Sequence, residues 1–375
     1  MRNIATISAG QGAPQGDSNY CEDGTPFVKA GNLAELLNGK PINTIQKVSE
    51  SVAKQHRLKL FPKGTVLFAK SGMSCLKGYV YVLPVDAYVV NHLACVTTNI
   101  EMSSYLRYFF NYHKPNKLVK DEAYPSISLE DIGDMTIDVK TDKEREYIVS
   151  VLDHVVQLIK LRQQQLLALD TLIKARFLEL YNSSALSEEM SIEAIVKRVK
   201  VGFVGTCEKH YTDKPGIPML RTGNITDNGI DLSDLKYVTS EFHEKNLKSQ
   251  IRAGDILIAR HGSNGQANVY YGPVAQCLNA VIIVPNPEIA SSVFLANLIN
   301  SPMVRSQIDR TLVGSTQHVV NTKSIATIIV RIPNLAIQRK FEIFVSQVDK
   351  SKSVVQAALE KAQLLFDSLM QQYFG

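Results

Sequence analysis

Residues 24–33 read GTPFVKAGNL, and residues 216–225 read GIPMLRTGNI, at an offset of 192 positions. A second pair, residues 64–72 (GTVLFAKSG) and 254–262 (GDILIARHG), repeats at an offset of 190. A third segment, SISLEDI at 126–132, matches the pattern of VVNTKSI at 319–325, at an offset of 193. Loop insertions and deletions explain small changes in offset. The chain is therefore predicted to be an internal duplication of one globular unit.

A long helix is predicted after each copy, because apolar positions alternate at spacings of four and three. The first stripe runs through Ile148, Leu152, Val155, Ile159, Arg162, Leu166, Leu169, Ile173, Arg176 and Leu180. The second, 193 positions later, runs through Phe341, Val345, Val348, Lys352, Val355, Leu359, Ala362, Phe366, Leu369 and Tyr373. Sustained alternation of this kind is typical of a coiled coil, in which charged stripe positions fix register or partner. Two unrelated core helices would not share one register.

The short polar linker at 182–191 determines the predicted arrangement of the two copies, because it is too short to carry the second copy far from the first helix. The second helix must then run back along the first. We predict an α+β fold with pseudo-two-fold symmetry, in which two mixed α/β domains (residues 1–140 and 185–334) are separated by two long antiparallel coiled-coil helices (residues 141–184 and 335–375). Strands are expected at 65–69, 79–83, 88–90 and 280–284, and helices near 102–112 and 291–299.

Helix length adds a distance to this arrangement. The first stripe spans roughly 48 Å at the usual helical rise. Two domains on such a rod could meet DNA about one turn apart, in opposite orientations. Sequence differences between the copies then predict two different half-sites.

Composition permits nucleic-acid binding without requiring it. The 375 residues carry a net charge of +5, with 45% hydrophobic and 21% charged residues, which is an ordinary globular balance. The longest apolar run is too short to span a bilayer, and residues 1–7 lack a signal-peptide core, so we expect a cytoplasmic protein without membrane contact. The five cysteines form no Cys-x-x-Cys pair. A plain thiol is favoured for Cys207, although His210 lies at a ligand spacing from it.

The repeated phrases resemble the specificity subunit of type I restriction-modification enzymes. The resemblance rests on residues 216–225, 254–263 and 314–318 (GSTQH), and on the helix openings DKEREYI at 142–148 and AIQRKF at 336–341. It implies two target recognition domains that each read half of a split site in double-stranded DNA. It also implies helices that set the spacer and bind two methyltransferase subunits, with restriction subunits joining the complex. The first copy departs from the family with PKGT at 62–65 and YPS at 124–126, which weakens transfer of residue roles but not of the fold.

No catalytic constellation is recognisable. The chain lacks a glycine-rich cofactor loop, an Asn/Asp-Pro-Pro-aromatic motif and a Walker loop. Glu130, Asp131 and Asp134 form an acidic cluster, but their repeat counterparts are not acidic, so a solvated turn is the better interpretation. His56, His92 and His243 are isolated and expected to be structural. We therefore expect no enzyme activity, cofactor or metal.

The strongest candidates for DNA contact lie in polar loops that follow apolar strands, where Arg and Lys could pair with guanine and Asn or Gln with adenine. In the first copy they are Lys70, Ser71, Ser74 and Lys77, and in the second Arg260, His261, Ser263, Asn264 and Gln266. Lys29, Arg221, Ser315, Gln317 and His318 are weaker candidates. The competing interpretation is a pair of plain polar hairpins.

The favoured hypothesis is a non-catalytic DNA-binding specificity subunit that recognises a bipartite target and recruits methyltransferase and restriction subunits. The alternative is a coiled-coil scaffold or adaptor that does not read DNA. A hydrolase acting on DNA is disfavoured, because the chain lacks a carboxylate–lysine cluster.

Overall fold

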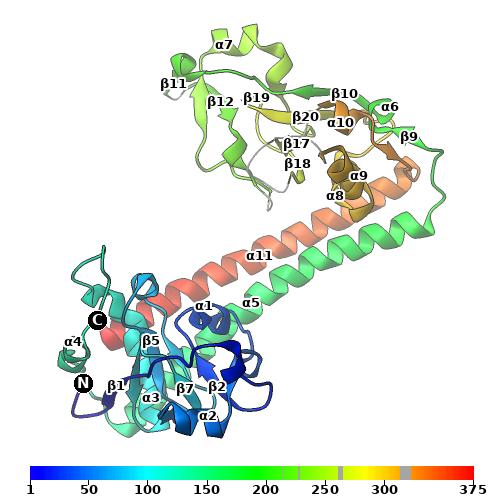
Figure 1. Cartoon of the computed structure of the whole chain (residues 1–375). Coiled ribbons are helices and arrows are strands. Elements are labelled where there is room, and N and C mark those ends of the chain that lie inside the picture. The colour runs from blue at the N-terminus through cyan, green and yellow to red at the C-terminus, as the bar shows by residue number, and fades with distance from the viewer. Residues whose placement is uncertain (214, 227–228, 261–264, 313–321) are drawn as a thin grey trace. The chain divides into compact units, whose positions relative to one another are not determined.

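The structure, a computed structural model, describes residues 1–213, 215–226, 229–260, 265–312 and 322–375. Its contacts divide the chain into two compact units, one made of Met1–Gln163 with Ala357–Gly375 and the other of Gln164–Gln356. Both long helices contribute to both units (Figure 1).

The first unit contains two four-stranded sheets. One is fully antiparallel with the order β1 (Thr6–Ala9), β8 (Leu93–Thr97), β5 (Val66–Ala69) and β6 (Tyr81–Val82). The other has the order β3 (Lys47–Val48), β2 (Thr25–Val28), β7 (Ala87–Val89) and β4 (Leu60–Phe61), with β2 and β7 parallel. The helices are α1 (Asn32–Leu37), α2 (Glu50–Gln55), α3 (Ile100–Tyr112) and α4 (Leu129–Asp134).

The second unit repeats both sheets. The antiparallel sheet has the order β10 (Val196–Val201), β20 (Ala280–Pro285), β17 (Ile256–Ala259) and β18 (Ala267–Val269). The mixed sheet has the order β11 (Tyr211–Thr212), β15 (Lys236–Val238), β12 (Ile217–Leu220), β19 (Ala275–Cys277) and β16 (Gln250–Ile251), with β12 and β19 parallel. Two small ladders pair β13 (Ile225–Thr226) with β14 (Gly229–Ile230) and β9 (Met190–Ser191) with β21 (Ile329–Val330). The short helices are α6 (Ile192–Ile195), α7 (Ser240–Lys245), α8 (Ser292–Asn300), α9 (Pro302–Leu312) and α10 (Thr322–Ala326).

Matched glycines mark the same crowded positions in both units. A Cβ on Gly10 would lie 2.0 Å from Val89 O, and a Cβ on Gly202 would lie 2.4 Å from Cys277 O. Val89 and Cys277 both end the second strand of the parallel pair. The repeated segments of the sequence therefore occupy corresponding places in the two units.

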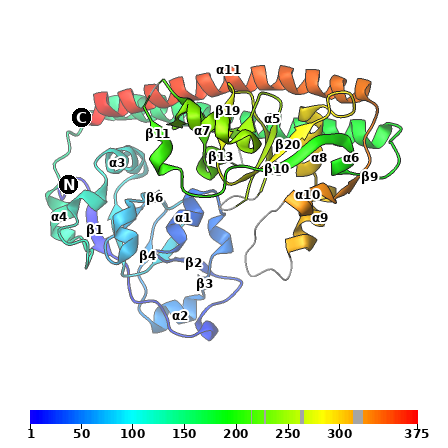
Figure 2. The ribbon, with the colours of Figure 1, turned by 90° about the horizontal axis from the view of Figure 1, so that it is seen from above.

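The long helices are α5 (Asp142–Ser183) and α11 (Leu335–Phe374). Every position of the two predicted stripes is buried or half-buried. Within the second unit, the Phe177 and Phe341 rings lie 5.6 Å apart, and Phe294 of α8 packs against both. Helices α8 and α9, which contact each other, follow one another in this unit (Figure 2). The predicted α+β class is confirmed, and α5 has the length and burial pattern expected of a central coiled-coil helix.

Buried polar side chains at equivalent positions form hydrogen bonds at the N-terminal ends of the two long helices. Arg145 of α5 donates through Nη1 to Lys140 O at 2.5 Å. Gln338 of α11, 193 positions later, donates through Nε2 to Pro333 O at 2.9 Å. Each bond satisfies a carbonyl just before the helix, that of a half-buried residue in Lys140 and that of a buried residue in Pro333.

Within the described ranges, no helix is long and apolar enough to cross a membrane. Across the same part of the chain, no three His, Cys, Asp or Glu side chains gather as a metal site would require.

Candidate nucleic-acid interface

The predicted contact residues of the first copy begin where β5 ends. Ala69, the last residue of β5, pairs with Leu93, so Lys70 follows directly opposite His92. The Lys70 N–H donates to His92 O at 2.9 Å, and Ser71 Oγ lies 2.8 Å from His92 Nδ1. A polar edge of Lys70, Ser71 and His92 thus lies at the end of a fully buried strand. His92 was expected to be an isolated histidine, but it is part of this edge.

Ser74 and Lys77 were expected to lie in a loop. They lie instead on a short 3-10 helix, η3 (Met73–Lys77). The helix forms because Cys75 is buried beneath it and because glycines at either end, Gly72 and Gly78, adopt positive φ angles of 77° and 60°. Lys77 is exposed, with its Nζ 5.9 Å from the centre of the Tyr79 ring. The helix therefore presents Lys77 to solvent and leaves Ser74 half-buried.

The second copy has a corresponding edge. Ala259 ends β17 opposite Ala280, which places Arg260 beside Asn279. Arg260 Nη1 donates to Asn279 Oδ1 at 3.2 Å. Asn279 has a φ of 53°, a left-handed conformation that Asn tolerates better than most residues. Asn279 and His92 each immediately precede the equivalent strand, so this edge has different chemistry in the two copies.

The remaining candidates of the second copy are divided between described and undescribed positions. Gln266 is half-buried and immediately precedes β18. Next to it, Gly265 O accepts a hydrogen bond from Arg305 Nη1 at 2.5 Å, which brings a further cation from α9 to this edge. Sequence reasoning missed Arg305, because it lies on a helix far along the chain. Six predicted contacts lie outside the described residues: His261, Ser263, Asn264, Ser315, Gln317 and His318.

Lys29 and Arg221 occupy equivalent places after β2 and β12. Their backbone N–H groups donate to Asn32 Oδ1 at 2.8 Å and to Asn224 Oδ1 at 2.9 Å, respectively. Their cationic groups are bound within their own units. Lys29 Nζ lies 2.6 Å from Gln46 Oε1, and Arg221 Nη2 lies 2.8 Å from Asp234 Oδ2. Both residues therefore have a structural role in the repeat.

The acidic cluster is part of a helix and not a turn, which corrects the expectation from the sequence. Glu130, Asp131 and Asp134 lie on α4, whose N-terminal cap is Ser128. Asp134 pairs with Arg2 at 3.0 Å and Asp131 with Lys120 at 3.0 Å. The hydrogen bond from Lys120 is the main reason why the pKa of Asp131 is lowered. These carboxylates are surface ion-pair partners.

The buried thiols have the character of core residues. Burial raises the pKa of Cys95 and of Cys277 to about 12, so both stay protonated at neutral pH. Cys207 is buried, with its Sγ 3.2 Å from the Tyr211 hydroxyl, as expected for a structural thiol.

A family model described as "Type I restriction modification DNA specificity domain" matches residues 2–170 and 205–362. The MjaIX specificity subunit of a type I restriction enzyme from Methanocaldococcus jannaschii is 23% identical over 176 residues, which are 45% of this chain and 39% of that protein. The EcoBI specificity subunit from Escherichia coli is 23% identical over 167 residues, 43% of this chain and 35% of that protein. Each alignment thus spans well under half of the relative.

Two solved structures share the fold along the whole chain. The crystal structure of a type I restriction-modification system S subunit from M. genitalium has a TM-score of 0.59 at 12% identity, and covers 100% of this chain and 94% of that one. A structure from work on complex assembly and conformational transition of the type I R-M system has a TM-score of 0.59 at 14% identity, with 100% and 96% coverage.

Proposed function

The chain belongs to the family of type I restriction modification DNA specificity domains, and we propose that it is the DNA-binding specificity subunit of a type I restriction-modification complex. In this proposal it recognises a bipartite sequence in double-stranded DNA, works in the cytoplasm and has no catalytic activity of its own. It recruits two methyltransferase subunits, and restriction subunits join them.

One observation carries the DNA-reading part of the proposal. The same strand end bears Lys70, Ser71 and His92 in one unit and Arg260 with Asn279 in the other. These side chains are hydrogen-bond donors and acceptors suited to base edges, and they differ between the copies. If each unit reads one half-site, the two half-sites differ in sequence.

We propose Lys70, Ser71, Ser74, Lys77, Arg260 and Gln266 as DNA contacts, together with His261, Ser263, Asn264, Ser315, Gln317 and His318. Lys29 and Arg221 are secondary candidates, because internal partners already bind their cationic groups. They would contact phosphate only after exchanging those partners.

The long helices are proposed to form an antiparallel coiled coil that separates domains 1–140 and 185–334. Two contacts within the second unit support this direction. Phe177 packs against Phe341, and Asp170, seven residues earlier on α5, pairs with Lys352, eleven residues later on α11. Partners that advance in opposite directions are typical of antiparallel helices.

A gel-shift and methyl-transfer assay tests the proposal. The purified chain alone should transfer no methyl group, and the chain with its methyltransferase subunit should bind and methylate DNA that carries one bipartite sequence. Binding of the pair without any sequence preference would contradict DNA reading and favour a scaffold. Metal-dependent cleavage by the pure chain would contradict the non-catalytic assignment.

A further inference from the structure

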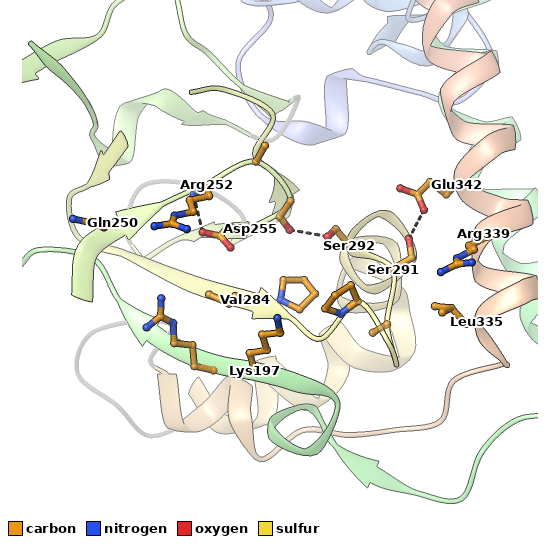
Figure 3. A pocket seen from close by; sticks show the side chains of 16 residues that line it. Lys197, Gln250, Arg252, Asp255, Val284, Ser291, Ser292, Leu335, Arg339 and Glu342 are labelled. Atoms are coloured by element: carbon orange, nitrogen blue, oxygen red, sulfur yellow. Dashed lines mark hydrogen bonds between the residues drawn. The ribbon is translucent and has the colours of Figure 1, made fainter. Parts of the chain in front are cut away.

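A pocket of about 620 Å³ lies within the second unit, between the start of β10, the turn before β17, the start of α8 and the first turns of α11 (Figure 3). Four cationic side chains line it, Lys197, Arg198, Arg252 and Arg339, and all four are exposed. None of the four forms an ion pair with any residue that the structure describes. They come from three segments that are far apart in the sequence, and the fold brings their positive charges together in the pocket.

The two carboxylates of the pocket are hydrogen-bonded to the protein itself. Asp255 is only 8% exposed, and its Oδ2 accepts the Arg252 N–H at 2.9 Å. Glu342 Oε2 accepts the Ser291 hydroxyl at 3.1 Å (Figure 3). With four cations against two engaged carboxylates, the pocket attracts negatively charged groups.

An apolar wall adds a second recognition element. Its side chains are those of Val284, Pro285, Pro287, Ala290 and Leu335. A DNA backbone offers phosphates and sugars but no apolar side chain to fill such a wall, whereas a peptide with acidic and apolar side chains matches both the cations and the wall. The pocket also begins at the opposite end of β17 from Arg260, and the five residue steps of extended chain from Asp255 to Arg260 span roughly 16 Å. The pocket is therefore separate from the proposed DNA-reading edge.

A pocket in the first unit corresponds to the helix side of this pocket and has the opposite charge. It is lined by Ile100, Asp142, Glu146 and Val149, which are the repeat counterparts of Ser292, Leu335, Arg339 and Glu342. Four carboxylates (Glu101, Asp142, Glu146 and Asp153) face two cations (Lys143 and Arg145) there. Asp142 pairs with Arg145 and Asp153 with Arg107, so Glu101 and Glu146 supply the negative charge that opposes an acidic segment there.

We propose that the basic pocket of the second unit docks an acidic, partly apolar peptide segment of a partner protein, and that one such segment binds per chain. This goes beyond the proposed DNA reading and does not depend on it. The charge inversion makes the two halves of the chain unequal toward partners, although their folds correspond.

Fluorescence anisotropy of the full chain tests the proposal, with a labelled peptide of alternating Glu and Leu as the probe. Peptides with Gln or Lys in place of Glu are the charge controls, and a short DNA duplex is the nucleic-acid control. The variant Arg252→Glu/Arg339→Glu reverses the pocket charge. Lys340→Glu makes one such charge reversal at the next exposed position of α11, outside the pocket.

We expect one Glu-Leu peptide per chain, weak binding of the Gln and Lys control peptides, and a loss of Glu-Leu peptide affinity of about tenfold or more in the double variant only. Arg339→Ala, which removes charge without adding any, should weaken binding by a smaller factor. Unchanged peptide affinity in the double variant would overturn the proposal. So would a loss of duplex binding as large as the loss of peptide binding, because the pocket would then be a nucleic-acid site.

Discussion

Lys352 Nζ lies 2.6 Å from Asp170 Oδ1, at a stripe position where the equivalent residue of α5 is Ile159. A cation within an apolar stripe costs burial energy, and an ion pair with the facing helix recovers part of it and favours one register. Because the two side chains are 32% and 48% exposed, solvent screens the pair. The Lys352–Asp170 pair therefore fixes the register of α5 and α11 more than it adds to the free energy of unfolding.

A double-mutant cycle measures this pair. Lys352→Ala, Asp170→Ala and the double variant should give a coupling energy of about 0.2–1 kcal/mol in urea unfolding. The Glu241–Lys245 pair of α7, which is more exposed, is the matched control and should couple more weakly. A coupling energy for Lys352 and Asp170 below that of the control would contradict a register role.

Alanine at Gly10 or at Gly202 should be destabilising by at least about 1–3 kcal/mol, because the new Cβ would collide with a backbone carbonyl. Urea unfolding of both variants measures this. Gly12→Ala and Gly223→Ala serve as controls, since a Cβ at either site meets nothing within 4 Å. If Gly10→Ala were as stable as Gly12→Ala, the close approach of Val89 in β7 to Gly10 would be wrong.

Gln338→Ala should lower the free energy of unfolding by about 1–3 kcal/mol. The fully buried amide accepts from the Ser291 N–H at 2.9 Å and donates to Ile289 O and Pro333 O, so its loss leaves buried polar groups without partners. Thermal unfolding of Gln338→Ala and of Gln347→Ala, an exposed position on the same helix, makes the comparison. Equal stability of the two variants would show that the packing of the start of α11 against the start of α8 does not depend on Gln338.

Lys70→Ala and Arg260→Ala should each alter one half of the recognised sequence and leave the other half unchanged. Loss of a base contact costs about 1–3 kcal/mol of discrimination at that base. Sequencing of DNA methylated by each variant complex reads both halves at once, so each variant is the control for the other. An unchanged motif would remove that residue from the proposed contacts, and loss of both halves would indicate a general phosphate contact.

The sequence predicted the helices better than it predicted the sheets, for a physical reason. The apolar stripe of a coiled-coil helix recurs every three or four residues, so it can be recognised within a short stretch of sequence. Pairing of β1 with β8 joins Thr6 to Thr97, and no local pattern specifies such a distant partner. The matched offsets nevertheless indicated that both units share one topology.

The site was predictable only where it coincides with a repeat. Lys70 and Arg260 were predicted because both follow a repeated strand. His92 and Asn279, which contact these loops, and Arg305, which bonds to Gly265 O, come from other segments of the chain. The 3-10 helix at Met73–Lys77 depends on burial of Cys75, and the polar sequence around Cys75 does not predict that this residue is buried. The basic pocket could not be predicted from the sequence, because its cations are dispersed between Lys197 and Arg339.

The central claim is that two units of one fold read two different half-sites, and in vitro selection from random DNA by the chain with its methyltransferase subunit tests it most directly. We predict that the selected DNA carries two short specific blocks of different sequence, separated by a spacer of fixed length and no preferred sequence. A single continuous block, or enrichment of no sequence at all, would contradict it.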